Sequence, residues 1–419
     1  MNRSVLNRIL ITFFFILLYR VLAYIPIPGV DAAVIKAFFD KNANNALGLF
    51  NIFSGNAVER FSLISLGVMP YITSSIIMEL LSATFPTLAA MKKDRDGMQK
   101  YSQIIRYVTI LITIIQSVSV SIGLRSLDSS YGNPILTNIS TFIFLSVFSM
   151  LAGTMMLMWL GEQITQRGVG NGISLIIFAG IVSGIPSAIV GMFELVNTGD
   201  INIFIFIVIV LIILLTVFLI IYIELAERRV PISYARKVVI KNQNKRVMNY
   251  IPVKLNISGV IPPIFASAIL IFPTTILQSS SNSIALMVAD FLNPSRYFYN
   301  VLMFFLVMFF AFFYSSIVFN SKDIAENLKK QGGFIPGLRP GEGTMEFLNT
   351  TASKLTFWGA LYLASVATIP WVILKSIGVP FVFGGTAVLI VVQVAIDTMR
   401  KIESHIYMNK YDTIGVIGL

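Results

Sequence analysis

The sequence predicts an all-α polytopic membrane protein, with ten membrane-spanning helices arranged as two pseudo-symmetric, inverted halves of five. Of its 419 residues, 56% are hydrophobic and only 12% are charged, and the mean hydropathy is +0.81. Soluble domains of this length do not have such a composition. Ten apolar runs are long enough to cross a bilayer core of about 30 Å. Most of the 31 Lys and Arg residues fall on one side of these runs, as the positive-inside rule requires.

The ten apolar runs divide into a first half, residues 1–195, and a second half, residues 196–419. They cover approximately residues 9–25, 64–84, 103–123, 138–160, 172–192, 201–223, 256–277, 298–320, 351–370 and 380–398. No small-residue cleavage site follows the first run, so we expect it to be retained as a span. An odd number of spans in each half inverts the second half, an arrangement common in transport folds. The basic segments place both termini in the cytoplasm, the C-terminal one as a tail over 399–419.

Two cytoplasmic loops, about 225–255 and 321–350, are longer than the others and basic. One interpretation is anchoring to anionic lipid headgroups. The other is docking of an acidic partner or RNA, because each loop also carries turn signals: RRVP at 228–231 and GGFIPGLRPG at 332–341. Anchoring does not require rigid turns that hold a basic side chain at a fixed place, so these turns favour recognition.

The stretch 48–82 differs from a plain spanning helix. Its first part is short, amphipathic and rich in glycine, and it contains Glu59 and Arg60. Its second part, about 65–84, is long enough to cross and includes Gly67 and Pro70. Non-helical backbone at membrane depth must be covered by protein or line a water-filled cavity. The stretch therefore predicts a cavity inside the helix bundle.

Polar residues inside the spans are few. The ionisable ones lie near the cytoplasmic ends, where long side chains can reach the headgroups: Glu79, Arg106, Glu162, Glu224, Lys354 and Asp397. Arg20, in the outer half of the first span, is the exception, and we expect it to extend outward or cap a carbonyl rather than handle an ion. The uncharged polar residues near mid-span are Ser74, Ser75, Gln116, Ser117 and Gln393. They predict either hydrogen bonds between helices or a polar seam that can open.

The composition also limits the chemistry. The chain has no cysteine and a single histidine, His405, which argues against disulfides, thiolate chemistry and histidine-based catalysis. No phosphate-binding loop or metal-ligand spacing is present in the sequence. We therefore expect no cofactor, no metal and no enzymatic activity.

An ordered series of short motifs runs along the whole chain. They are PIPG at 26–29, FSG at 53–55, GVMPYI at 67–72, RGVGNGIS at 167–174, GVIP at 259–262, FAS at 265–267, IPGLRPG at 335–341 and FGGT at 383–386. Together with the ten spans and the two long loops, this series resembles the SecY/Sec61-alpha family, the channel-forming subunits of the Sec protein translocase.

The resemblance implies a central protein-conducting channel. Two five-helix halves would enclose an hourglass pore with a lateral gate toward lipid. Unfolded secretory chains would cross through it, and membrane proteins would leave it sideways. The channel would be passive, with energy supplied by a partner ATPase or the ribosome. The expected location is the cytoplasmic (inner) membrane of a bacterium, with a plastid thylakoid membrane as the less favoured alternative.

The resemblance also assigns residues. It implies a pore ring of Val68, Ile72, Ile76, Ile177, Ile264 and Ile390. It implies a short plug helix at about 51–62, including Phe53, Ser54, Gly55, Asn56, Glu59 and Arg60. Ser74, Ser75 and Gln116 would lie at the lateral gate, between spans 2 and 3 on one side and spans 7 and 8 on the other. Arg228, Arg229, Lys245, Arg246 and Arg339 would dock partners.

The partners that the resemblance implies are SecE and SecG as translocon subunits, the SecA ATPase, the ribosome, and further SecDF and YidC. Signal peptides and nascent chains would be the substrates, and anionic lipids the surroundings. Two other functions fit ten spans: an ion-coupled small-solute secondary transporter and a structural membrane scaffold. The absence of midplane charges disfavours the transporter, and the broken second span disfavours the scaffold.

Overall fold

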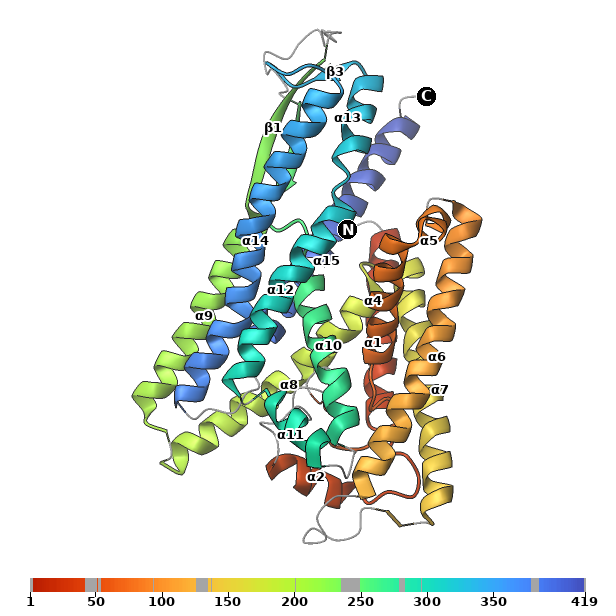
Figure 1. Ribbon diagram of the computed structural model, residues 1–419, viewed down its shortest axis with the longest axis vertical. Coiled ribbons are helices and arrows are strands. Elements are labelled where there is room, and N and C mark those ends of the chain that lie inside the picture. Colours follow the sequence, from red (N-terminus) through yellow and green to blue (C-terminus); the bar gives the residue numbers. More distant parts are fainter. Residues whose placement is uncertain are drawn as a thin grey trace.

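The structure, a computed structural model, is that of an elongated helix bundle with a small sheet at one end (Figure 1). It describes residues 3–41, 51, 54–92, 94–125, 135–136, 138–199, 201–234, 249–278, 283–294, 296–377 and 384–417. In this view α1, α4, α6 and α7 lie on the right and α9 and α14 on the left, while α8 crosses between them. The expected boundary between the halves, 195/196, falls in the last turn of α8.

Helices overlap all ten expected spans. They are α1 (Arg3–Ala23), α4 (Met69–Thr84), α6 (Arg95–Arg125), α7 (Ile139–Arg167), α8 (Gly172–Asn197), α9 (Ile203–Leu225), α10 (Ile261–Gln278), α12 (Tyr297–Val318), α14 (Glu342–Ile377) and α15 (Gly385–Ile417). Within the described ranges, seven helices are long and apolar enough to cross a membrane. These seven do not include α4, α10 and α15, whose crossing stays a prediction.

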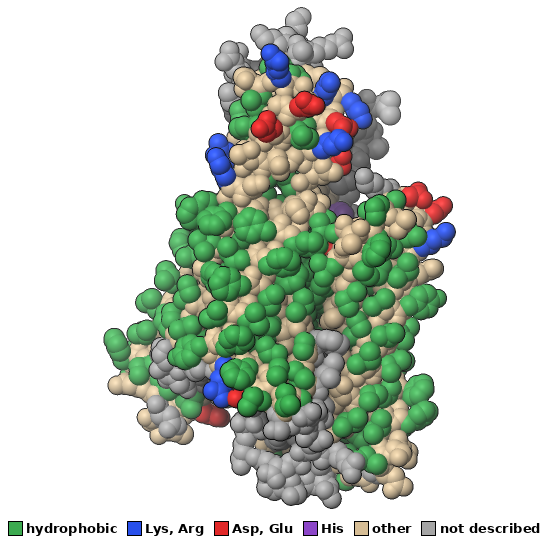
Figure 2. Space-filling view, viewed as in Figure 1, with side chains coloured by type: hydrophobic (Ala, Val, Ile, Leu, Met, Phe, Trp, Pro, Cys, Tyr) green, Lys and Arg blue, Asp and Glu red, His purple; other side chains and the backbone are tan. Residues whose placement is uncertain are grey.

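The outer surface agrees with a membrane location. Figure 2 shows hydrophobic side chains over most of the visible face of the bundle, with charged side chains gathered at the end that carries the sheet. The side chains of α9 illustrate this: Phe204 is 70% exposed and Leu214 is 64% exposed. Exposed apolar surface on this scale is stable only in lipid or against a partner.

The helix of the second span begins later than expected. It starts at Met69 instead of about residue 65, and residues 55–68 form a series of turns. Gly67 has a φ of 57°, a left-handed conformation that interrupts a helix. Pro70 then occupies the first turn of α4, where its missing N–H costs nothing. The chain leaves α4 at Phe85, which is extended because Pro86 follows it.

The two long loops are not simple loops. They form a three-stranded antiparallel sheet in the order β2-β1-β3. Strands β1 (Glu227–Tyr234) and β2 (Asn249–Lys254) come from the first loop, and β3 (Gly333–Phe334) comes from the second. The sheet adds a β element to the expected all-α fold. Val230 and Ile232 in β1 are buried or half-buried and flank the exposed Pro231, and Ile251 and Val253 in β2 flank the exposed Pro252 in the same way, which is the period-two burial of a half-buried sheet.

Four short helices complete the described part of the chain: α2 (Ala32–Lys41), α5 (Pro86–Met91), α11 (Ser283–Phe291) and α13 (Ser321–Lys330). Helix α13 begins at an Asn320 side chain that accepts hydrogen bonds from the backbone N–H groups of Lys322 and Asp323. This is a regular N-cap.

Two hydrophobic clusters organise the interior. The main core joins buried residues of α1, α4, α8, α10, α12, α14 and α15. A second group, which we call the sheet cluster, consists of Val230, Val253, Leu328, Ile335 and Leu348. Helix α14 belongs to both, because Leu348 lies in the sheet cluster while Leu363 lies in the main core. The sheet is therefore packed onto the bundle and is not a separate domain.

Candidate functional site

The segment 54–68, which precedes α4, is the centre of the candidate site. It is almost entirely buried: Ala57, Val58 and Phe61 are each at most 3% exposed. Its backbone is held to the end of α1, since the N–H of Ile27 donates to Phe61 O at 2.9 Å and the N–H of Leu63 donates to Ile25 O at 2.9 Å. These bonds dock the segment against the bundle without any regular secondary structure.

The expected plug helix over 51–62 is wrong for residues 55–62. Asn51 and Ser54 are helical, but the chain then continues as turns. Gly55, Asn56 and Phe61 have φ values of 71°, 65° and 45°, which are incompatible with a right-handed helix. Phe53 lies outside the described residues.

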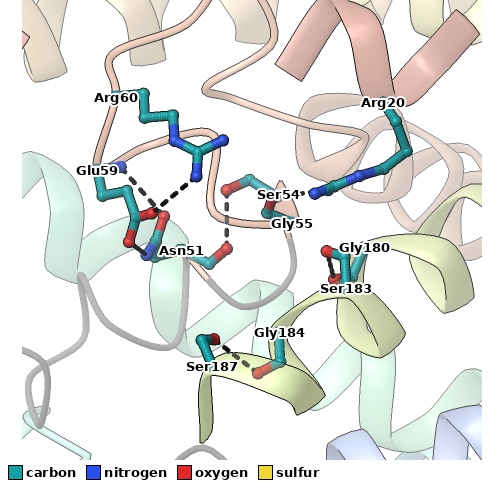
Figure 3. A network of polar contacts seen from close by, with 10 residues as sticks. All are labelled: Arg20, Asn51, Ser54, Gly55, Glu59, Arg60, Gly180, Ser183, Gly184 and Ser187. Carbon is teal, nitrogen blue, oxygen red and sulfur yellow. Dashed lines mark hydrogen bonds and ion pairs between the residues drawn. The ribbon is translucent and has the colours of Figure 1, made fainter. Parts of the chain in front are cut away.

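Two consecutive residues of α1 hold the start of this segment. The hydroxyl of Tyr19 donates to Ser54 O at 3.1 Å, and Arg20 Nη1 donates to Gly55 O at 3.0 Å (Figure 3). Arg20 therefore caps a carbonyl, as expected for a guanidinium in the outer half of the first span. Tyr19 is 1% exposed, so its hydroxyl has exchanged water for this bond.

Glu59 and Arg60 belong to a second polar group around Asn51. The Asn51 side chain accepts from the Glu59 N–H at 3.1 Å and donates to Glu59 Oε2 at 3.0 Å. Arg60 lies 3.8 Å from Glu59 Oε1, and its guanidinium lies 4.0 Å from the centre of the Tyr24 ring. The Arg60 side chain keeps 32% of its surface exposed, so this pair is at the edge of the core and is not fully desolvated.

The six expected pore residues come from four elements of the chain. Ile72 and Ile76 lie on α4 and Val68 is its N-cap, while Ile177, Ile264 and Ile390 lie on α8, α10 and α15. All six are at most 8% exposed, and all belong to the main core. The structure thus brings them into one apolar cluster, which is necessary for a ring.

The expected gate residues lie on α4 and α6, and both helices contact α10. Ser74 is buried and donates to Pro70 O at 2.7 Å within its own helix, so it forms no bond between helices through this hydrogen. Ser75 is half-buried. Gln116 is 5% exposed, and its Oε1 has no hydrogen-bond partner among the described residues.

The expected docking residues lie at the sheet end. Arg228 and Arg229 are exposed on β1, and Arg229 Nε donates to Glu227 Oε1 at 2.9 Å. Arg339 is exposed in the turn after β3 and borders a hollow of about 860 Å³ that also contains Lys322 and Lys329. Lys245 and Arg246 lie outside the described residues.

Sequence reasoning missed one buried polar network at the C-terminal end of α9. Glu224, 3% exposed, accepts from Asn256 Nδ2 at 2.5 Å. Asn256 Oδ1 accepts from the Gly259 N–H at 2.9 Å, and Arg400 Nη2 lies 3.5 Å from Glu224 O. The network ties α9, the turn before α10, and α15 together. The only signal in the sequence is the Asn-Ile-Ser-Gly turn at 256–259, typical of an Asx turn.

The comparisons with known proteins decide the family. The SecY family model matches residues 62–399. The protein translocase subunit SecY of Helicobacter pylori (strain ATCC 700392 / 26695) is 72% identical over 419 residues, covering 100% of both chains. The chain belongs to the SecY family. Its relatives include SecY of Pseudomonas aeruginosa, 42% identical over 97% of this chain and 92% of that one.

Solved structures related to SecY have the same fold. A structure described as a protein conducting channel has a TM-score of 0.67 at 17% identity, and covers 96% of this chain and 93% of the other. A second, whose title concerns the plug domain of the SecY protein, has a TM-score of 0.68 at 20% identity and the same coverage. The predicted family, the fold of packed helices and the function of a protein translocase channel subunit are thus confirmed.

Proposed function

We propose that this member of the SecY family is a passive conduit, through which unfolded secretory chains cross, and membrane proteins enter, the cytoplasmic membrane of a bacterium. The pore would lie between the halves 1–195 and 196–419. The observation that carries the proposal is the burial of six aliphatic residues, drawn from α4, α8, α10 and α15, in one cluster. The turn segment that precedes α4 would serve as the plug, and its buried side chains belong to the same cluster.

The constriction would seal by excluding water. The members of the pore ring, Val68, Ile72, Ile76, Ile177, Ile264 and Ile390, offer no hydrogen bonds, so a narrow collar of them dewets and blocks ions. Aliphatic side chains can still part around an extended chain and close on it. The seam of α10 with α4 and α6 would be the lateral gate, with Ser74, Ser75 and Gln116 beside it.

Direction would come from partners at the sheet end. Arg228, Arg229 and Arg339, with Lys245 and Arg246, would receive the SecA ATPase or the ribosome. Support comes from the exposure of the first three and from two fold neighbours, Sec61 in a canine ribosome-channel complex and a yeast Ssh1 complex bound to the ribosome. We expect SecE and SecG as further subunits, SecDF and YidC as accessory partners, and anionic lipids around the basic loops.

Crosslinking of a stalled secretory chain tests the conduit. A photoreactive group at position 72 or 177 should crosslink to the stalled chain, because both positions would line the path. The same group at Leu214, on the exposed face of α9, is the matched control and should crosslink only to lipid. An ion-coupled transporter or a scaffold would give no crosslink at any of the three positions.

A further inference from the structure

Two side-chain hydrogen bonds to the start of segment 54–68 come from a single helix, α1. Tyr19 and Arg20 of α1 bond two consecutive carbonyls, those of Ser54 and Gly55. Both acceptors are main-chain atoms, so the grip does not depend on the side chains of the segment. Arg20 is positively charged, and a bond from a charged donor is roughly twice as strong as a neutral one.

The same point of the segment also touches α8 at closest range. A Cβ built on Gly55 would lie 2.9 Å from Gly180 Cα and 2.6 Å from the Tyr19 hydroxyl oxygen. A Cβ on Gly180 would lie 3.0 Å from that oxygen and 3.3 Å from Gly55 N. A side chain at Gly55 would force its neighbours to shift, and one at Gly180 would press on the Tyr19 hydroxyl and on the backbone of Gly55. One turn further along α8, Gly184 faces Asn56, whose Oδ1 would be 3.8 Å from an added Cβ.

The two serines on this face of α8 direct their hydroxyls to carbonyls of their own helix. Ser183 donates to Gly180 O at 2.6 Å, and Ser187 donates to Gly184 O at 2.9 Å, both within the helix (Figure 3). With the two glycines, they form a stripe at i, i+3, i+4 and i+7 on one helix face. The stripe is not an empty groove, because Gly55 already lies in contact with it.

We propose that Tyr19, Arg20 and this α8 stripe form a latch that seats the plug on the N-terminal half. The inference rests on the proposed role of segment 54–68 as a plug. All the latch residues lie within residues 1–195. Separation of the two halves would therefore leave these contacts intact, and the plug would stay seated until the two α1 bonds break. Release of the latch is then a step distinct from opening of the gate, and Tyr19 and Arg20 act as positioning residues.

The test uses the absence of cysteine in the natural chain. Ala57, 0% exposed, is replaced by cysteine, and a membrane-impermeant maleimide is applied to the outer face while ion leakage is recorded. Tyr19→Phe, Arg20→Gln and Gly180→Ala are added one at a time. Tyr19→Phe and Arg20→Gln should each raise the labelling rate by about tenfold, the equivalent of one lost hydrogen bond to a charged or buried group. Gly180→Ala should raise the rate as well, because its Cβ would press on the Tyr19 hydroxyl and on Gly55.

Gly191→Ala is the matched control on the same helix, because an added Cβ there meets nothing within 4 Å. It should label at the parent rate. Unchanged labelling in Tyr19→Phe, Arg20→Gln and Gly180→Ala would overturn the latch, even if deletion of 54–61 caused a leak. Raised labelling without any leak would keep the latch and refute the plug role. Tyr19→Phe removes only a hydroxyl, so it keeps the test valid if the other variants do not fold.

Discussion

Ile264 and Ile390 reach the proposed constriction from different helices, α10 and α15, and both are buried in the main core. We expect Ile264→Asn or Ile390→Asn to increase ion leakage, because an amide in a narrow apolar collar binds the water that aliphatic groups exclude. Patch-clamp recording of reconstituted channels measures this. Ile390→Val is the control that keeps the surface aliphatic. Leakage equal to wild type in both asparagine variants would contradict the constriction.

Asn256 carries a second prediction at the residue scale. Its amide donates to the buried carboxylate of Glu224 and to Gly259 O. Asn256→Ala should destabilise the protein by about 2 kcal/mol, because it leaves the buried carboxyl group of Glu224 without its donor. Thermal unfolding in detergent measures the loss. Asn349→Ala, at an exposed position on α14, is the control, and an equal shift in both variants would refute the specific role of the network.

At the scale of elements, the sheet gathers two loops that are far apart in the sequence, and it presents the proposed docking residues. We expect Arg339→Glu, or Arg228→Glu with Arg229→Glu, to block translocation while the channel itself still inserts into the membrane. The reason is charge reversal at a surface that would meet an acidic partner. Secretion of a reporter and the abundance of the channel in membranes are the two measurements. Lys354→Glu, exposed on α14, should secrete normally, and unimpaired secretion in the docking variants would refute docking.

The elements show how far sequence reasoning reaches. The apolar runs located ten helices, because burial in lipid demands long uninterrupted hydrophobic stretches. The predicted plug helix is wrong over residues 55–62, because the left-handed backbone of Asn56 and Phe61 leaves no clear trace in composition. The sheet was interpreted as loops, because proline, which is rare inside strands, separates the apolar residues of β1 at Pro231 and those of β2 at Pro252. The bond between Asn256 and Glu224 joins residues 32 positions apart, and one sequence does not reveal such pairings.

At the scale of the whole molecule, the expected topology places the end of α8 outside and α13 in the cytoplasm. Single cysteines at Asn197 and Glu326, both exposed, should therefore react with an impermeant maleimide from opposite sides of the membrane. Intact cells should label only Asn197→Cys, and inverted vesicles only Glu326→Cys. The two variants serve as controls for each other, and labelling of both from the same side would reject the inverted halves.

Helix α14 links the sheet to the main core of the bundle. Its 36 residues extend about 54 Å at about 1.5 Å per residue, while the hydrocarbon core of a bilayer is about 30 Å thick. Nearly half of the rod therefore stands clear of the lipid, with Leu348 clamped in the sheet cluster and Leu363 embedded in the main core. A tilt of α14 would therefore pivot where the helix enters the lipid. A load applied to the sheet would be transmitted along α14 to the main core, in which Leu363 is buried.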